Sequence, residues 1–225
     1  MYNFEDKSVV ITGGASGIGR ATVKLLGGYG AGLTFLDIDG ASGEEFRDEL
    51  SSAGVKVQFV EGDVVSEEAV ETLIRTAVDT YHGIDVLVNN AGINKMGAIE
   101  TLSVQDWDLC ADINGKGTFL CTKHAIPHLK SRGGGSIVNL ASINSFEGKA
   151  LRGAFTYSKG GIVNFTKTLA AELGPFGIRV NAVAPGAVLT KEFRHHIAQG
   201  TVNTDRLIEL TPLRSLLEPE DVANA

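Results

Sequence analysis

The chain has 225 residues, 43% of them hydrophobic, and a formal net charge of −7 at pH 7. That length suits a single α/β domain over residues 1–225, with enough apolar side chains for a substantial core. The acidic balance argues against nucleic acid and anionic membranes as partners, because both attract basic surfaces. The hydrophobic content excludes a chain that is disordered throughout.

The N-terminus and the cysteines favour a cytoplasmic protein. Residues 1–6 are partly acidic without an apolar signal core, and no uncharged apolar run reaches the length of a membrane span. Cys110 and Cys121 lack the spacing of a disulfide framework or a zinc site, so we expect two reduced core thiols. His195 and His196 have no further ligands at metal spacing, and no metal site is expected.

Short apolar runs alternate with stretches of helical periodicity. We expect strands at residues 8–12, 33–37, 56–60, 85–89, 136–141 and 178–184, and helices at 17–26, 44–53, 67–81, 104–129 and 154–173. Strands that are apolar on both faces and joined by crossover helices predict a parallel sheet covered on both sides. Right-handed crossovers make this a three-layer, doubly wound α/β fold. Residues 186–214 are polar and irregular, and we expect them to form a flap beside the site.

A glycine-rich turn links the first expected strand to the first helix. Its sequence, Thr12-Gly13-Gly14-Ala15-Ser16-Gly17-Ile18-Gly19, has the spacing G-x-x-x-G-x-G. Glycine permits a tight turn and lets backbone N–H groups approach a pyrophosphate at the helix N-terminus. Glycine clusters also serve purely structural turns, so both interpretations stay open on this motif alone.

An acidic residue ends the second expected strand. Asp37 lies near the distance from the glycines at which a carboxylate meets the ribose 2′-hydroxyl of a dinucleotide. Such a carboxylate accepts hydrogen bonds from the diol and repels a 2′-phosphate, and neither Ser16 nor Ile38 supplies a positive charge. NAD is therefore favoured over NADP. The alternative is a turn residue, because Asp39 and Gly40 follow.

Together with Asn89-Asn90-Ala91-Gly92 after the fourth strand, these features resemble the short-chain dehydrogenase/reductase family along nearly the whole chain. The resemblance implies a Rossmann-type fold. It implies that NAD is bound by Gly13, Ser16, Gly17, Ile18, Gly19, Asp37, Asp63, Val64, Asn90, Ala91, Gly92, Lys159, Pro185, Gly186, Val188 and Thr190. Asp63 would contact the adenine end, although it could instead terminate the third strand, and Asn89 and Asn90 could satisfy a turn.

The same resemblance implies a catalytic group made of a tyrosine, a serine, a lysine and an asparagine. Ser142, Lys159 and Asn114 match the last three, but Phe155 stands at the tyrosine position, four residues before Lys159. In the family the tyrosine transfers the proton, the serine orients the substrate oxygen, and the lysine lowers the pKa of the tyrosine. We therefore expect an intact cofactor site with impaired turnover.

Tyr157 is the tyrosine closest in sequence to that position. On a helix, residues 155 and 159 lie about 40° apart, whereas residue 157 points about 200° from either. Four residues after Tyr157 stands Gly161, which carries no charge. We expect Tyr157 to pack against a neighbour or lie at a subunit interface, and only a register change at the two glycines 160 and 161 would turn it inward.

The last residues, 218–222, resemble the start of the family's final helix, and the chain ends at Ala225. By this comparison the rest of that helix and a seventh strand are expected to be missing, which would leave a sheet edge uncovered. The resemblance also implies a homodimer or homotetramer that forms through the helices at 104–129 and 154–173.

Two classes of function follow. The first is an NAD(H)-dependent oxidoreductase that interconverts a secondary alcohol and a ketone as its small-molecule substrate, impaired by Phe155. The second is a non-catalytic NAD(H)-binding protein, such as a sensor or a partner subunit. The substrate is not defined by the sequence, and the candidates for lining its pocket are Ile143, Asn144, Phe146 and Phe193.

Overall fold

A computed structural model describes residues 3–225 of the chain. Within this range the chain forms a parallel sheet with strand order β3-β2-β1-β4-β5-β6. In chain order the strands are β1 (Ser8–Thr12), β2 (Gly32–Asp37), β3 (Val57–Glu61), β4 (Val86–Asn89), β5 (Gly135–Leu140) and β6 (Ile178–Val183). The predicted doubly wound α/β fold is confirmed.

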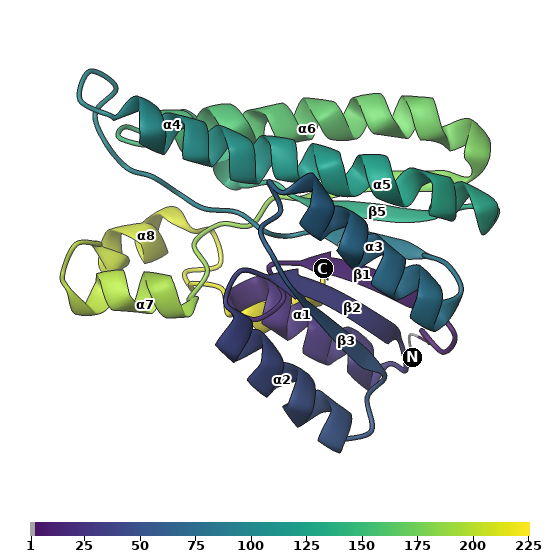
Figure 1. Ribbon diagram of the computed structural model, residues 1–225. Helices are drawn as coiled ribbons and strands as arrows, with labels where there is room; N and C mark the ends of the chain where they lie inside the picture. Colours follow the sequence, from purple (N-terminus) through teal and green to yellow (C-terminus); the bar gives the residue numbers. More distant parts are fainter. Residues whose placement is uncertain (1–2) are drawn as a thin grey trace.

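Helices cover both faces of this sheet (Figure 1). The helices are α1 (Gly17–Gly28), α2 (Gly40–Ser52), α3 (Glu67–Tyr81), α4 (Val104–Cys110), α5 (Gly117–Ser131), α6 (Gly153–Leu173), α7 (Lys191–Ala198), α8 (Thr204–Leu210) and α9 (Pro219–Ala223). In Figure 1, α3, α5 and α6 lie on one side of the strands, and α1 and α2 lie on the other.

Alternate residues of the central strand face opposite helix layers. Val10 belongs to a buried cluster with Leu73 of α3, whereas Val9 and Ile11 belong to a second cluster with Phe46 of α2. Every residue of β1 is buried, as expected for a strand covered on both faces. The continuous apolar run at 8–12 therefore reflects two cores divided by one sheet.

The stretch expected as one helix over 104–129 has a change of helical pitch in its middle. Between α4 and α5, residues Ala111–Lys116 form a π-helix, in which the Gly117 N–H donates to the Asp112 carbonyl. A wider turn of this kind is frequent at functional sites. Asn114 lies inside it and is fully buried.

Residues 186–214 differ from the expectation of an irregular segment, because they contain α7 and α8. Thr190 caps α7 by accepting from the Phe193 N–H, and Asn203 caps α8 in the same way. Neither helix buries any residue, and at eight and seven residues each is too short for an apolar period to stand out in the sequence. In Figure 1 both helices extend to one side of the sheet.

Two further expectations concern burial and membranes. Cys110 and Cys121 are both buried and unpaired among residues 3–225, as expected of core thiols. Burial raises the pKa of the Cys121 thiol to about 12. A search of the described helices finds none with the length and apolar character needed to cross a bilayer.

Candidate active site and cofactor cavity

A cavity of about 320 Å³ lies at the carboxyl ends of β1, β2 and β4. In a doubly wound sheet, ligands bind where the strand order reverses, which here is between β1 and β4. Of the residues expected to bind cofactor, the lining includes Gly13, Ser16, Gly17, Ile18, Asp37, Asp63, Val64, Asn90, Ala91, Gly92 and Thr190. The lining also includes residues that the sequence did not single out as cofactor ligands: Leu36, Ile38, Gly62, Ile93, Ile113, Lys191 and Glu192.

The glycine loop opens the N-terminus of α1 toward this cavity. Gly13 and Gly17 have positive φ angles of 66° and 52°, a conformation that disfavours other residues. A β-carbon on Gly19 would overlap the Gly13 carbonyl oxygen, so this glycine allows the loop to pack onto the helix. Ser16 makes no side-chain cap, and no acidic residue lies in the first turn. The first N–H groups of α1 are therefore left for a ligand, which fits a pyrophosphate.

Asn90 and Thr12 hold the loop in place. Asn90 Nδ2 donates to the carbonyl oxygens of Thr12 at 2.9 Å and Gly13 at 3.0 Å. In return, Thr12 Oγ1 accepts from the N–H groups of Asn90 and Ala91. Asn90 thus ties the end of β4 to the glycine loop, which is a larger role than satisfying a turn.

The two strand-end carboxylates both face the cavity. Asp37 Oδ2 accepts from the Ala15 N–H at 2.9 Å, and Asp37 Oδ1 accepts from the Asp39 N–H at 3.1 Å. Asp63 Oδ1 accepts from the Val65 N–H at 3.1 Å. Asp37 therefore stabilises the glycine loop as well as its own turn, Asp63 stabilises its own turn, and both keep further lone pairs for a ligand.

Lys159 is buried beside the Gly92 end of the cavity. Its Nζ donates to the Leu140 carbonyl, at the end of β5, at 2.5 Å. A β-carbon on Gly92 would lie 3.2 Å from Lys159 Nζ and 3.0 Å from Asn114 Oδ1, so this glycine allows both side chains to approach the cavity wall. Burial lowers the pKa of Lys159 to about 8.

Asn114 fixes the segment that follows Gly92. Its Oδ1 accepts from the Ile93 N–H at 2.9 Å, and its Nδ2 donates to the Ile93 carbonyl at 3.0 Å. Nδ2 also donates to Ser158 Oγ at 2.9 Å. Ser158 is a buried residue that the sequence did not single out, and its only signal was a small hydroxyl side chain directly before Lys159.

Ser142 follows β5, and 9% of its surface is exposed. Its Oγ accepts from the Asn144 N–H at 3.1 Å, which leaves the hydroxyl hydrogen available to a substrate oxygen. The Ile143 N–H donates to the Pro185 carbonyl at 3.0 Å, so the turn after β5 is tied to the segment after β6.

Phe155 and Tyr157 point in different directions from α6. Phe155 is half-buried and lies one turn before Lys159, and its carbonyl accepts from Ser158 Oγ. Tyr157 is 64% exposed and packs on Trp107 of α4, with ring centroids 4.9 Å apart. The helix runs through Gly160 and Gly161 without a break, which agrees with the outward direction expected for Tyr157.

Five of the residues expected to bind cofactor lie outside the cavity lining: Gly19, Lys159, Pro185, Gly186 and Val188. Gly19 and Lys159 are buried directly behind it, as described above. Val188 bridges to Leu217, and Thr190 lies closest to the glycine loop, because its Cγ2 is 3.3 Å from an ideal β-carbon on Gly17. The segment after β6 therefore reaches the glycine loop through Thr190.

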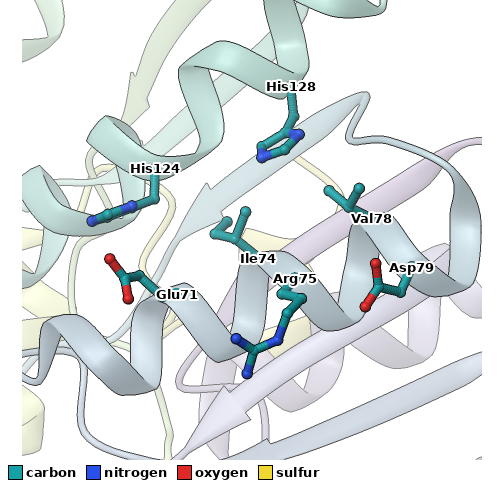
Figure 2. A pocket seen from close by; sticks show the side chains of 7 residues that line it. All are labelled: Glu71, Ile74, Arg75, Val78, Asp79, His124 and His128. Atoms are coloured by element: carbon teal, nitrogen blue, oxygen red, sulfur yellow. The ribbon is translucent and has the colours of Figure 1, made fainter.

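A second hollow, of about 360 Å³, lies between α3 and α5 (Figure 2). Figure 2 shows Glu71 and His124 facing one another across it. Side-chain oxygen and nitrogen atoms of Glu67, Glu71 and His124 lie within 4.8 Å of one another, which is close enough to coordinate a metal ion. The sequence did not indicate this cluster. Glu67 Oε1 is already bound by Lys123 Nζ at 2.6 Å and by His124 Nε2 at 2.8 Å. An ion pair between helices accounts for this cluster.

Comparison with known proteins identifies the family. The model of the short chain dehydrogenase family matches residues 7–200. The chain belongs to the short-chain dehydrogenase/reductase family. Its members bind nicotinamide cofactors, NAD(H) or NADP(H), and the chain is accordingly an oxidoreductase.

Curated relatives in this family match almost the entire chain. A subunit of (2S)-[(R)-hydroxy(phenyl)methyl]succinyl-CoA dehydrogenase from Thauera aromatica is 36% identical, over 98% of this chain and 87% of its own length. Cis-4-hydroxycyclohexanecarboxylate dehydrogenase from Sinomonas cyclohexanicum is 36% identical, over 99% and 88%. A 3-oxoacyl-[acyl-carrier-protein] reductase from Synechocystis is 32% identical, over 95% and 85%. These relatives are named for oxidation of alcohols and reduction of ketones.

Proposed function

We propose that this chain is an NAD(H)-dependent oxidoreductase domain, spanning residues 1–225, that interconverts a secondary alcohol and a ketone with turnover impaired at Phe155. The observation that carries the proposal is the junction at Gly92. There the dinucleotide cavity meets Lys159 and Asn114, and Lys159 is bonded to the strand end that presents Ser142. A substrate carbonyl held at this junction would lie beside both the nicotinamide and the side chains of Ser142 and Lys159.

The residues around that junction supply all but one part of the chemistry. When bound, the nicotinamide ring accepts or donates a hydride. Ser142 would orient the substrate oxygen through its free hydroxyl hydrogen, and Lys159 would add positive charge nearby. Phe155 has no hydroxyl to transfer the proton, which removes a contribution of about 10² to 10⁴ in rate.

Asp37 supports a preference for NAD over NADP. Its carboxylate lies in the cavity lining at the end of β2, where a ribose diol would donate to it and a 2′-phosphate would be repelled. Lys191 also lines the cavity, but Glu192 lies next to it with the opposite charge. The local balance therefore remains acidic.

The phenylalanine also favours a second candidate, a non-catalytic NAD(H)-binding protein. In that case the cofactor cavity would serve sensing or assembly, and Phe155 would be the natural residue of a protein that no longer catalyses a reaction. The two candidates differ in whether the site around Phe155 still accepts a substrate.

Assembly and location complete the proposal. The outer surface of α4, α5 and α6 exposes large apolar side chains, including Val104 at 71%, Phe119 at 49% and Tyr157 at 64%. Exposed apolar groups gathered on neighbouring helices support a homodimer or homotetramer formed through this face. The unpaired thiols of Cys110 and Cys121 agree with a reducing compartment such as the cytoplasm.

The deciding experiment restores the missing hydroxyl. We expect Phe155→Tyr to raise the rate of NADH oxidation with cyclic and linear ketones by about 100-fold or more, because it returns the general acid to a site that already holds Lys159. Phe176→Tyr, at an exposed phenylalanine outside the site, should change nothing. NADH bound by both proteins without any gain in turnover would favour the non-catalytic candidate.

A further inference from the structure

Three buried polar side-chain atoms at the start of α6 and in the segment bonded to it have no hydrogen-bond partner among residues 3–225. They are Asn94 Oδ1, Arg152 Nε and Thr156 Oγ1. The other unpartnered atoms of this kind, on Ser8, Thr34 and Asn89, belong to the interior of the sheet. Buried polar groups in folded proteins are nearly always paired, so a local group of unpaired ones needs a physical explanation.

The three residues are brought together by two adjacent segments. Residues 92–97 run along the first half of α6: Gly92 lies against Lys159, and the Gly97 N–H donates to the Leu151 carbonyl at 2.9 Å. Gly97 also pairs with Arg152 as an isolated bridge. Asn94 lies between these two fixed points.

Thr156 and Arg152 belong to the same end of α6. The Thr156 N–H donates to the Arg152 carbonyl at 2.8 Å, so the two residues lie one helical turn apart. Phe155 stands between them in the chain. Arg152 and Thr156 therefore belong to the turn of α6 that carries Phe155, one turn before Lys159.

Arg152 stands out among these residues because it is charged. It occupies the N-cap position of α6 without making a side-chain cap, and it is half-buried. Its guanidinium forms no hydrogen bond or ion pair with any residue that the structure describes. Burial lowers the pKa of Arg152, and no carboxylate offsets this effect. A buried donor left unpaired destabilises the folded state, and a bound anion would satisfy it.

We propose that Arg152 binds a carboxylate of the substrate, and that the substrate is therefore an oxo acid or hydroxy acid. This inference rests on the proposed function and names its substrate class. A guanidinium offers two parallel N–H donors that match the two oxygens of a carboxylate. The Thr156 hydroxyl, four residues further along α6 and so on the same helix face, can donate a further hydrogen bond.

Phe155 makes the test simple, because slow turnover lets a complex with NADH and a ketone persist. The probes are 4-oxocyclohexanecarboxylate, 4-oxopentanoate and the methyl ester of each. Their dissociation constants from the protein holding NADH are measured by NADH fluorescence and calorimetry. We expect each acid to bind more tightly than its ester.

The variants separate charge from shape. Arg152→Gln should weaken acid binding by about tenfold or more and leave ester and NADH binding within about twofold, because the lost ion pair serves only the charged probe. Arg152→Lys should retain part of the acid preference. Lys149→Gln, which removes the same charge from an exposed residue nearby, should have no effect.

Other outcomes would overturn the inference in distinguishable ways. Equal weakening of acid and ester, or a fall in melting temperature alone, would make Arg152 a structural residue. Unchanged acid binding in Arg152→Gln, or wild-type protein that binds the esters as tightly as the acids, would reject the carboxylate contact while leaving the oxidoreductase proposal intact. Failure of all four probes to bind the protein–NADH complex would reject this inference, whereas the proposed function is tested separately by the turnover of Phe155→Tyr.

Discussion

At the scale of single residues, Asp37 has a structural role and also stands where we propose that the ribose is recognised. Its two oxygens accept from the N–H groups of Ala15 and Asp39, which orders both the glycine loop and the start of α2. The same carboxylate lines the cavity. The sequence left a turn residue and a ribose ligand as alternatives, and this geometry allows one side chain to do both.

This double role leads to a prediction for Asp37→Asn. Asparagine keeps one acceptor oxygen for the loop but loses the negative charge, so the preference for NADH over NADPH should fall by about tenfold or more. Dissociation constants of both cofactors, measured by fluorescence, test this. Asp39→Asn is the matched control, since asparagine is an equally good helix cap and removes a charge two residues away. An unchanged ratio in Asp37→Asn would place the ribose elsewhere.

Phe155 and Tyr157 are the two aromatic residues of α6 on which the proposed loss of turnover depends. The helix that carries them is regular from Gly153 to Leu173, and Tyr157 is stacked on Trp107. Tyr157 thus occupies the packing position expected for it. Regular helix geometry decided this point, because a residue two positions away on a helix faces another direction.

At the scale of elements, the start of α1 depends on one close contact. A β-carbon on Gly19 would overlap the Gly13 carbonyl and approach Asn90 Nδ2 to 2.5 Å. Gly13 is the residue at which the loop bends with a positive φ. The glycine loop, α1 and Asn90 therefore pack closely together only because residue 19 has no side chain.

We predict that Gly19→Ala disrupts this packing. The added methyl group should force the loop away from α1, lower the free energy of unfolding by about 2 kcal/mol and weaken NADH binding by about tenfold or more. Urea unfolding and NADH titration measure both effects. Gly28→Ala is the control on the same helix, because a β-carbon there meets nothing within 4 Å and alanine favours helix. Similar behaviour of the two variants would contradict the packing argument.

The π-helix is the other element on which the site depends. Its wide turn places Asn114 inside, where one amide side chain holds both the N–H and the carbonyl of Ile93. The segment from Gly92 to Gly97 is thereby fixed at one end by Asn114 and at the other by Leu151. An α-helix of uniform pitch over 104–129, as the periodicity predicted, would have turned Asn114 to a different angle.

At the scale of the whole molecule, Lys159 couples the site to global stability. Burial lowers its pKa from 10.5 to about 8 in the folded protein. Between these values the unfolded chain holds the proton and the folded protein has released it. The unfolded state therefore binds more protons, and this lysine makes the free energy of unfolding rise as pH increases from about 8 to about 10.5.

We predict that this contribution disappears in Lys159→Met. The free energy of unfolding of Lys159→Met minus that of the wild type should fall by about 2 kcal/mol as pH is raised from neutral to alkaline, because only the wild type gains stability from releasing the lysine proton. The variant is compared with the wild type at each pH because Tyr81 and Cys121 act in the opposite direction in both proteins. Burial raises their pKa values to about 12, which makes the free energy of unfolding fall at alkaline pH. Lys167→Met, at an exposed lysine of α6, should run parallel to wild type. Parallel curves for Lys159→Met would contradict the assignment.

Much of the architecture could be predicted from local sequence. The strands at 8–12 and 178–183 and the helix at 67–81 fall at or within one residue of the expected bounds, because buried strands and an amphipathic helix each have a distinct apolar period. Helices α7 and α8 could not be predicted in this way, because they bury nothing and are defined by their Thr190 and Asn203 caps.

The sequence by itself determined the parallel α/β fold, the family, the glycine loop and the replacement at Phe155, since each is written in residue type and spacing along the chain. Only the tertiary structure decided how Asn114 holds Ile93, how Gly92 admits Lys159 and Asn114, and that the Arg152 side chain has no partner among residues 3–225. The physical reason is the range of the interactions. Periodicity and turn chemistry act between neighbours in sequence, whereas these contacts join segments 20 to 70 residues apart, whose approach depends on how the helices pack on the sheet.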